Sequence, residues 1–113
     1  MGNGESSSII KNKIVMSLPI ILRLTAQAEF DEAFDWYESQ RSGLGVDFID
    51  SLAIVINRIN TNPKFYSIIF QDIRRAIVRK FPYAIFYRIE AEQITIIAIF
   101  HSKRDPELIQ FRK

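Results

Sequence analysis

The last third of the chain, residues 73–113, most constrains the fold because it holds three apolar runs that are cut into short strands. Side chains alternate along each run with the period of two that a strand requires, and turn-prone pairs separate the runs. Phe81-Pro82 marks one turn, and Ala91-Glu92 marks the other. The pattern therefore predicts an antiparallel meander of three strands, residues 73–80, 83–90 and 93–100.

Upstream of the meander, helical periodicity predicts a hairpin of two antiparallel helices. A short strand that begins near Ile20 comes first, and Thr25 is the expected N-cap of the first helix. Gly43 is expected to end this helix in the left-handed conformation. The second helix is expected from about residue 45 to residue 61, because Asn62-Pro63 cannot continue the helical hydrogen bonds.

The predicted fold class is α+β, in which an N-terminal strand and a two-helix hairpin precede a three-stranded meander that packs on the helices. The hairpin can cover only one face of the sheet, so we expect the other face to be exposed to water. Residues 65–72 form a connector without an assigned element. On the first helix we expect Phe34, Trp36 and Tyr37 in the core, with Trp36 partly exposed, and the acidic residues on a solvated face.

The composition is typical of one domain with its own apolar core, since 48% of the 113 residues are hydrophobic. We expect that domain to span residues 16–113, after a flexible N-terminal tail of residues 1–15, with Met16 as an alternative start. The chain has no cysteine, which excludes a disulfide framework, a thiolate zinc site and a cysteine nucleophile. The single histidine, His101, excludes a multi-histidine metal site, so neither a metal nor a cofactor is expected.

The sequence shows no feature of export or membrane anchoring. No apolar run approaches the roughly 20 residues that a membrane-spanning helix needs. The polar start lacks the basic and apolar regions of a secretory signal. We therefore expect a soluble, cytoplasmic protein.

The net charge of +2 conceals a division of charge along the chain. Residues 26–62 contain seven acidic and two basic residues, a balance of −5, whereas residues 73–113 contain four acidic and nine basic residues, a balance of +5. This asymmetry favours an anionic partner that meets one half only, either nucleic acid or an acidic protein segment. The alternative is two solvated surfaces of opposite sign.

The order of one strand, two helices and three strands resembles the RelE/ParE superfamily of toxins from type II toxin–antitoxin systems. The resemblance extends from about Ile20 to Leu108. The segments that carry it are Leu24-Thr25-Ala26-Gln27-Ala28-Glu29, Ile73-Arg74-Arg75, Phe81-Pro82-Tyr83-Ala84-Ile85-Phe86-Tyr87-Arg88, Ile94 to Ile99, and His101-Ser102-Lys103-Arg104-Asp105-Pro106. The resemblance implies a small growth-inhibiting protein that a cognate antitoxin holds inactive.

Two activities are known in this superfamily. RelE-like members cleave mRNA in the ribosomal decoding site, whereas ParE-like members poison DNA gyrase and have no nuclease activity. The ending from His101 to Pro106 resembles the ParE-like, plasmid-stabilisation branch, and the chain after His101 lacks the tyrosine that RelE-like nucleases commonly use. We therefore expect a non-enzymatic gyrase poison. The alternatives are a ribosome-dependent mRNA endonuclease and an inactive relic that only binds its antitoxin.

Arg79 and His101 are the candidate catalytic residues if the chain is a nuclease. Arg79 falls where the resemblance places a basic residue of RelE-like nucleases, and its guanidinium could stabilise a phosphate. His101 could serve as an acid or a base. The alternative interpretation of His101 is a residue that ends a strand and hydrogen-bonds the following loop.

A basic surface in the last third is expected to contact the target or the antitoxin. Its candidate residues are Arg74, Arg75, Arg79, Tyr87, Lys103 and Arg104. Tyr87 could stack on a base, although cross-strand packing is favoured. The expected antitoxin is an acidic, partly disordered segment that folds on this surface, either as an added strand or as a helix along the hairpin.

Overall fold

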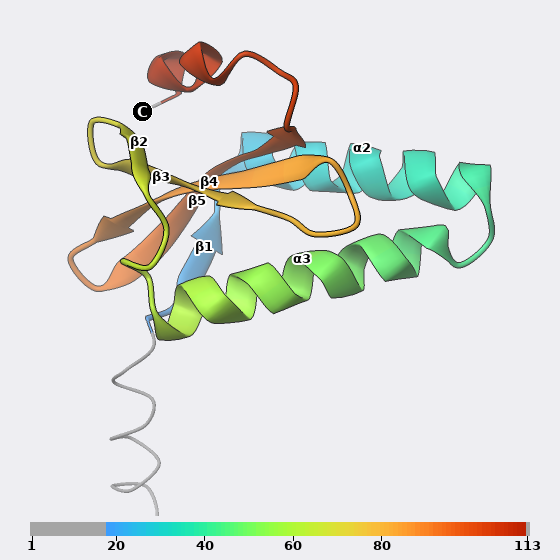
Figure 1. The fold of residues 1–113 in the computed structure, drawn as a ribbon, viewed down its shortest axis with the longest axis horizontal. Coiled ribbons are helices and arrows are strands. Elements are labelled where there is room, and N and C mark those ends of the chain that lie inside the picture. Colours follow the sequence, from blue (N-terminus) through green and yellow to red (C-terminus); the bar gives the residue numbers. More distant parts are fainter. Residues whose placement is uncertain (1–17, 113) are drawn as a thin grey trace, which may run out of the picture.

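A five-stranded sheet with a helical hairpin on one face forms the framework of the protein (Figure 1). The computed structural model describes residues 18–112, so the expected tail, residues 1–15, and the alternative start at Met16 lie outside the described residues. The elements in chain order are β1 (Ile20–Leu22), α2 (Leu24–Gln40), α3 (Leu44–Thr61), β2 (Ile68–Phe70), β3 (Ile73–Ile77), β4 (Tyr83–Glu90), β5 (Gln93–His101) and the 3-10 helix η1 (Pro106–Phe111).

The sheet has the strand order β1-β5-β4-β3-β2. Strand β1 runs parallel to β5, and all other neighbouring strands are antiparallel. The predicted α+β class, with an N-terminal strand, a helical hairpin and a meander of β3, β4 and β5, is therefore confirmed.

The structure adds one strand to the predicted sheet and shortens another. Strand β2 forms within the connector 65–72, and its register against β3 is irregular. A three-residue, irregular strand is too short to show alternation in the sequence. Strand β3 ends at Ile77 and not at residue 80, because Lys80 has a φ of +74° and the N–H of Val78 donates to the carbonyl of Tyr83 to close the turn.

Helix α2 begins directly at the end of β1, so the prediction that Thr25 caps this helix is wrong. The N-cap is Arg23, whose N–H donates to the carbonyl of Ile96 in the sheet at 3.0 Å. The carbonyl of Arg23 accepts the helical bond from the N–H of Gln27 at 2.9 Å. One residue thus ends the strand and starts the helix, and Thr25 lies within the first turn.

Two glycines and Glu38 fix the turn between α2 and α3, which projects past the sheet in Figure 1. Gly43 has a φ of +90°, which confirms the predicted left-handed conformation, but Gly43 is the N-cap of α3, and α2 ends at its C-cap Arg41. The N–H of Gly43 and that of Gly45 donate to the two carboxylate oxygens of Glu38 at 3.0 and 2.9 Å, and these bonds lower the pKa of Glu38. Gly45 also permits close packing, because a Cβ there would lie 2.7 Å from the ring of Phe34.

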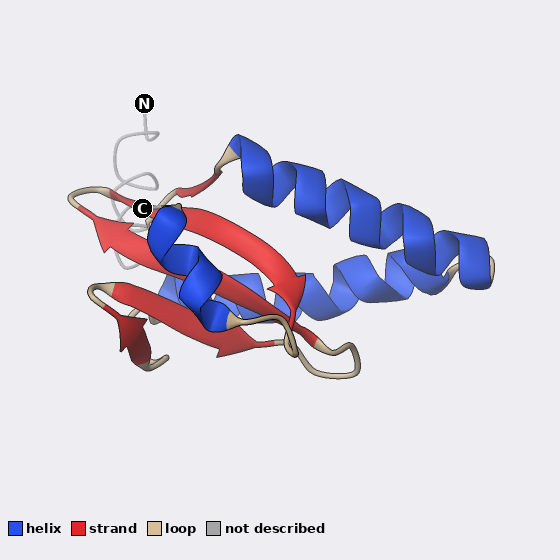
Figure 2. Cartoon of the chain, turned by 90° about the horizontal axis from the view of Figure 1, so that it is seen from above, coloured by secondary structure: helices blue, strands red, loops and turns tan. Residues whose placement is uncertain are grey.

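The second face of the sheet is covered in part, so the prediction that this face stays exposed to water is wrong for β4 and β5. The hairpin packs on one face around an aromatic cluster centred on Phe48. On the other face, Ile109 of η1 packs with Phe86 and Phe100. Figure 2 shows η1 in front of the strands and α3 behind them. The physical reason is that β5 is buried from Ile94 to Phe100 and is apolar on both sides.

Glu29 of α2 fastens the C-terminal segment to the rest of the fold. Arg112 donates to both oxygens of the Glu29 carboxylate at 2.9 and 2.7 Å, and Arg104 lies 3.5 Å from it. The backbone N–H of Ile99 in β5 also donates to this carboxylate, at 3.0 Å. The Glu29 side chain is only 14% exposed, so these donors replace water around its charge. Helix α2, strand β5 and the C-terminal segment therefore meet at one carboxylate.

The substitution Glu29→Ala is expected to lower the free energy of unfolding by about 2–4 kcal/mol, because Arg112 and the N–H of Ile99 lose a largely buried partner. Urea unfolding followed by circular dichroism measures this change. The control is Asp35→Ala, which removes an exposed carboxylate from the same helix and should change the free energy by at most about 0.5 kcal/mol. Equal losses in the two variants would contradict the role of Glu29.

Candidate functional site: a groove between helix α3 and strand β3

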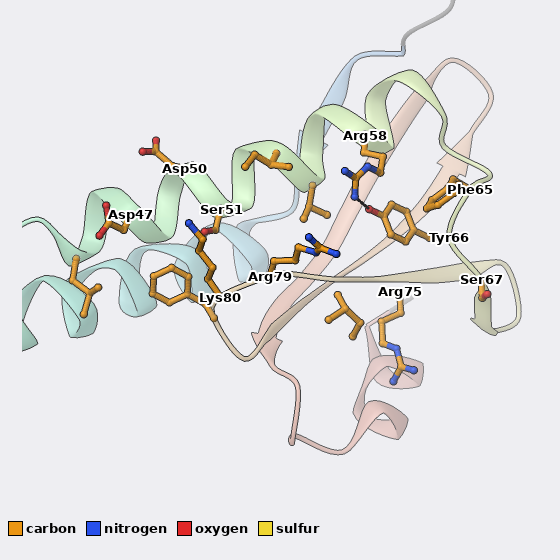
Figure 3. Close-up of a pocket in the computed structure, with 15 residues that line it drawn as sticks. Asp47, Asp50, Ser51, Arg58, Phe65, Tyr66, Ser67, Arg75, Arg79 and Lys80 are labelled. Carbon is orange, nitrogen blue, oxygen red and sulfur yellow. Dashed lines mark hydrogen bonds between the residues drawn. The ribbon is translucent and has the colours of Figure 1, made fainter.

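A groove with a volume of about 990 Å³ lies between helix α3, the connector and the turn that follows β3 (Figure 3). Helix α3 contributes one wall. The connector contributes a second wall, and strand β3 with the turn that follows it contributes a third. The lining residues are Leu44, Asp47, Asp50, Ser51, Ile54, Val55 and Arg58 of α3, then Phe65, Tyr66, Ser67, Arg75, Ile77, Arg79, Lys80 and Phe81.

Large apolar side chains in this groove are exposed to water. Ile54 of α3 is 59% exposed, Phe65 of the connector is 61% exposed, and Ile77 of β3 is 51% exposed. They line a single hollow although they come from three different segments. A cluster of exposed apolar side chains of this kind is typical of a surface that binds another protein.

Acidic and basic side chains line different parts of the groove, although Arg58 adds a cation to the α3 wall. Asp47 and Asp50 belong to the α3 wall, and Arg79 and Lys80 belong to the turn after β3. Figure 3 shows Arg79 and Lys80 reaching toward α3, while Arg75 points away from that helix. A partner that enters between these walls therefore meets separate positive and negative surfaces, which would fix its orientation.

Strand β3 presents an open backbone edge at the groove. The N–H of Arg75 donates to the carbonyl of Ser67 at 3.1 Å, on the side away from β4. The N–H of Val78 donates to the carbonyl of Tyr83 in β4. Since neighbouring residues of a strand point to alternate sides, the N–H and C=O of Ile77 also point away from β4. Strand β2 pairs only with Ile73 and Arg74, so an extended peptide could pair at Ile77.

Arg74 and Tyr87, two predicted contact residues, instead hold the connector that forms one end of the groove. The hydroxyl of Tyr87 donates to the carbonyl of Pro63 at 2.6 Å, and burial raises the pKa of Tyr87 to about 12. Arg74 donates to the carbonyls of Tyr66 and Lys64 at 2.6 and 3.2 Å. Tyr87 is fully buried, which agrees with the packing interpretation and leaves no ring face for a base.

The remaining candidate residues lie in different places. Arg75 is exposed on the face that η1 covers in part. Arg104 pairs with Glu29 and lies 4.9 Å over the ring of Phe100, whereas Lys103 is exposed. His101 lies in a second hollow beside α2, and its Nδ1 accepts from the N–H of Lys103 at 3.1 Å.

Arg79 and His101 therefore do not line the same hollow, since Arg79 belongs to the groove. Within residues 18–112, no group of three or more His, Asp or Glu side chains is arranged to hold a metal ion. In the same part of the chain, no helix is long and apolar enough to cross a membrane.

The exposed apolar residues of the groove were not among the predicted site residues; they are Ile54, Phe65 and Ile77. Ile54 of α3 is exposed beside the buried Val55, so an apolar residue outside the buried stripe of the helix was a usable signal. Phe65 lies in the segment without an assigned element, so its position gave no signal. Strand alternation puts Ile77 on one face with Arg75 and Arg79, but the exposure of Ile77 depends on where β2 ends.

The fold is similar to that of a solved toxin–antitoxin protein. A chain of the structure titled "Chromosomal ParDE TA system from P. aeruginosa" matches with a TM-score of 0.67 and 12% sequence identity. The match covers 76% of this chain and 97% of that chain. No curated protein matches the chain. The likeness shows that the fold is one used by toxin–antitoxin proteins.

The family follows from a second comparison. Residues 20–106 match the family described as "ParE toxin of type II toxin-antitoxin system, parDE", which is most of the chain. The chain therefore belongs to the ParE toxin family, and the resemblance to the RelE/ParE superfamily is confirmed. The protein is therefore a toxin of the type II toxin–antitoxin class.

Tyr87 is expected to make the protein less stable in alkali. Its pKa is about 12 when folded and about 10 when unfolded. A pKa raised by folding stabilises the protein below the unfolded value, and this contribution is lost as the pH rises toward the folded value. From about pH 9 to about pH 11, the free energy of unfolding should fall by about 1.3 kcal/mol more in the wild type than in Tyr87→Phe.

Urea unfolding of both proteins at the two pH values measures this difference. Because only the change with pH is compared, the hydrogen bond that Tyr87→Phe loses at every pH does not affect the result. An equal fall in both proteins would show that Tyr87 ionises as easily in the folded protein as in the unfolded one.

Proposed function

We propose that this chain inhibits growth by poisoning DNA gyrase in the cytoplasm and that a cognate antitoxin neutralises it. The observation that carries the proposal is the match of residues 20–106 to ParE toxins. ParE-like members of the superfamily act on gyrase without nuclease activity. The chain would then act by binding, as a protein that traps another enzyme and needs no cofactor.

The placement of the basic residues favours binding over RNA cleavage. Cleavage by the 2′-hydroxyl of RNA needs a base, an acid and positive charge that converge on one phosphate. Arg79 and His101 line separate hollows, and one nitrogen of His101 already accepts a backbone hydrogen bond. This separation supports a binding mechanism over acid–base cleavage of RNA.

Purified chain is expected to make gyrase leave double-strand breaks in a supercoiled plasmid, because a trapped gyrase complex keeps its DNA cut. The measurement is the amount of linear plasmid after proteolysis of the reaction, with and without the chain. His101→Ala should retain at least about half of this activity, because a mechanism that acts by binding does not need His101 as an acid or a base. In growing cells, the DNA damage response should precede any arrest of translation.

Two outcomes would contradict this mechanism. If translation stops first, and if both Arg79→Ala and His101→Ala abolish that arrest, the chain is an mRNA endonuclease. If the chain binds the antitoxin but affects neither growth nor translation and causes no DNA damage, it is an inactive relic. Folding of each variant is checked by circular dichroism, so a loss of structure is not mistaken for a loss of mechanism.

The groove is the proposed binding site of the antitoxin. An added strand at the open edge of β3 would pair with the backbone of Ile77, while its apolar side chains cover Ile54 and Phe65. Acidic residues of the same segment would face Arg79 and Lys80. Because apolar burial and backbone pairing add to the charge contacts, salt should weaken this complex less than a purely electrostatic one.

The substitution Ile77→Asp is expected to weaken binding of the antitoxin by at least about 30-fold, because it places a carboxylate among the exposed apolar side chains that line the groove. The antitoxin used is the product of the adjacent reading frame, and isothermal titration calorimetry measures the affinity. The matched control is Ile21→Asp, which alters a similarly exposed isoleucine on the opposite edge of the sheet. Equal weakening by the two substitutions would place the antitoxin elsewhere.

A further inference from the structure

A second hollow, with a volume of about 700 Å³, lies on the other side of the turn between β3 and β4 and is distinct from the groove. We call it the aromatic hollow; it is lined by Glu32, Ala33, Trp36, Tyr37, Pro82, Tyr83 and His101. Helix α2 supplies one wall, because residues spaced by three and four lie on one helical face. Strands β4 and β5 supply the other wall, where Tyr83 is paired directly with His101.

Four aromatic rings line this hollow in a continuous series. Trp36 and Tyr37 meet edge to face, with ring centroids 5.1 Å apart, and Tyr37 lies 6.1 Å from Tyr83. Tyr83 in turn lies 5.6 Å from the ring of His101. Trp36 is 58% exposed, which agrees with the expectation that it is partly exposed. A tryptophan at the open side of such a hollow is typical of a residue that a partner covers.

The aromatic hollow is negatively charged, in contrast to the basic side of the groove. Helix α2 contains five acidic residues and neither lysine nor arginine. Glu29 is matched by Arg104 and Arg112, whereas Glu32 and Asp35 form no ion pair with any residue in the range 18–112. Burial raises the pKa of Tyr83, and the negative charges of Glu32 and Glu29 raise it further.

We propose that the aromatic hollow binds an arginine side chain of a partner protein. Rings attract a cation through their electron-rich faces, and the Glu32 carboxylate adds a charge partner at the same place. A guanidinium suits such a site better than an ammonium, since it is planar, stacks on rings and is more weakly hydrated. Lys103 is an exposed cation two residues after His101, but it does not line the hollow.

The chemistry of the hollow separates this partner contact from the groove. Arg79 and Lys80 in the groove select acidic residues, whereas Glu32 and the rings select a basic one. A single carboxylate makes a poor site for a divalent metal ion, which prefers several oxygen ligands. An anionic partner would be repelled by Glu32 and Asp35.

The experiment uses the full chain and the probe N-acetyl-arginine methylamide. Trp36 is the only tryptophan, so its fluorescence and its single indole N–H signal in nuclear magnetic resonance report directly on the hollow. Both signals are expected to change in a saturable way, with a dissociation constant in the millimolar range. N-acetyl-citrulline methylamide has nearly the same shape without the charge, and it should bind at least about fivefold more weakly.

Variants test the role of the carboxylate. Glu32→Gln should weaken binding of the arginine probe by about three- to fivefold, while Asp31→Asn, an exposed change on the same helix outside the hollow, should leave it unchanged. Equal binding of the arginine and citrulline probes, or an indole signal that neither probe moves, would overturn the proposal. Glu32→Gln should also keep full affinity for the antitoxin, so failure of this inference is distinguishable from failure of the proposed function.

Discussion

The structure depends on the need to cover strand β5 on both sides. Residues Ile94–Phe100 are all buried, and a register shift between β4 and β5 places both Ile97 and Ala98 in the cluster away from the hairpin. A strand that is apolar on both faces must lie between two covering layers. The helical hairpin supplies one layer, and the short helix η1 with β2 supplies part of the other. Glu29 then ties the two layers together at the edge of β5.

This arrangement changes the role of the basic residues in the last third of the chain. Arg104 and Arg112 bind Glu29, Arg88 pairs with Asp72, and Arg74 donates to the connector. These cations therefore hold segments of the fold in place and do not form the continuous basic sheet surface that the charge division suggested. The exposed basic residues that remain, such as Arg79 and Lys80, owe their position to the turn after β3.

Two hollows on either side of that turn give the molecule two surfaces of different chemistry. The groove combines exposed apolar side chains, an open strand edge and the cations Arg79 and Lys80. The aromatic hollow combines four rings with the carboxylate of Glu32. Two surfaces of such different chemistry would favour partners of different chemistry.

The sequence by itself determined the two long helices, strands β1, β4 and β5, most of β3, the fold class and the family. Period-two and helical patterns, the left-handed Gly43 and the proline after Asn62 depend on neighbouring residues, so each could be read along the chain. The tertiary structure alone decided that β2 forms, that η1 covers the second face and that Tyr87 is buried. It also brought Glu29 to Arg112, 83 positions away in the sequence, and it placed Arg79 and His101 in separate hollows. Such contacts depend on strand register and on how the layers stack, and no local period in the sequence records either of them.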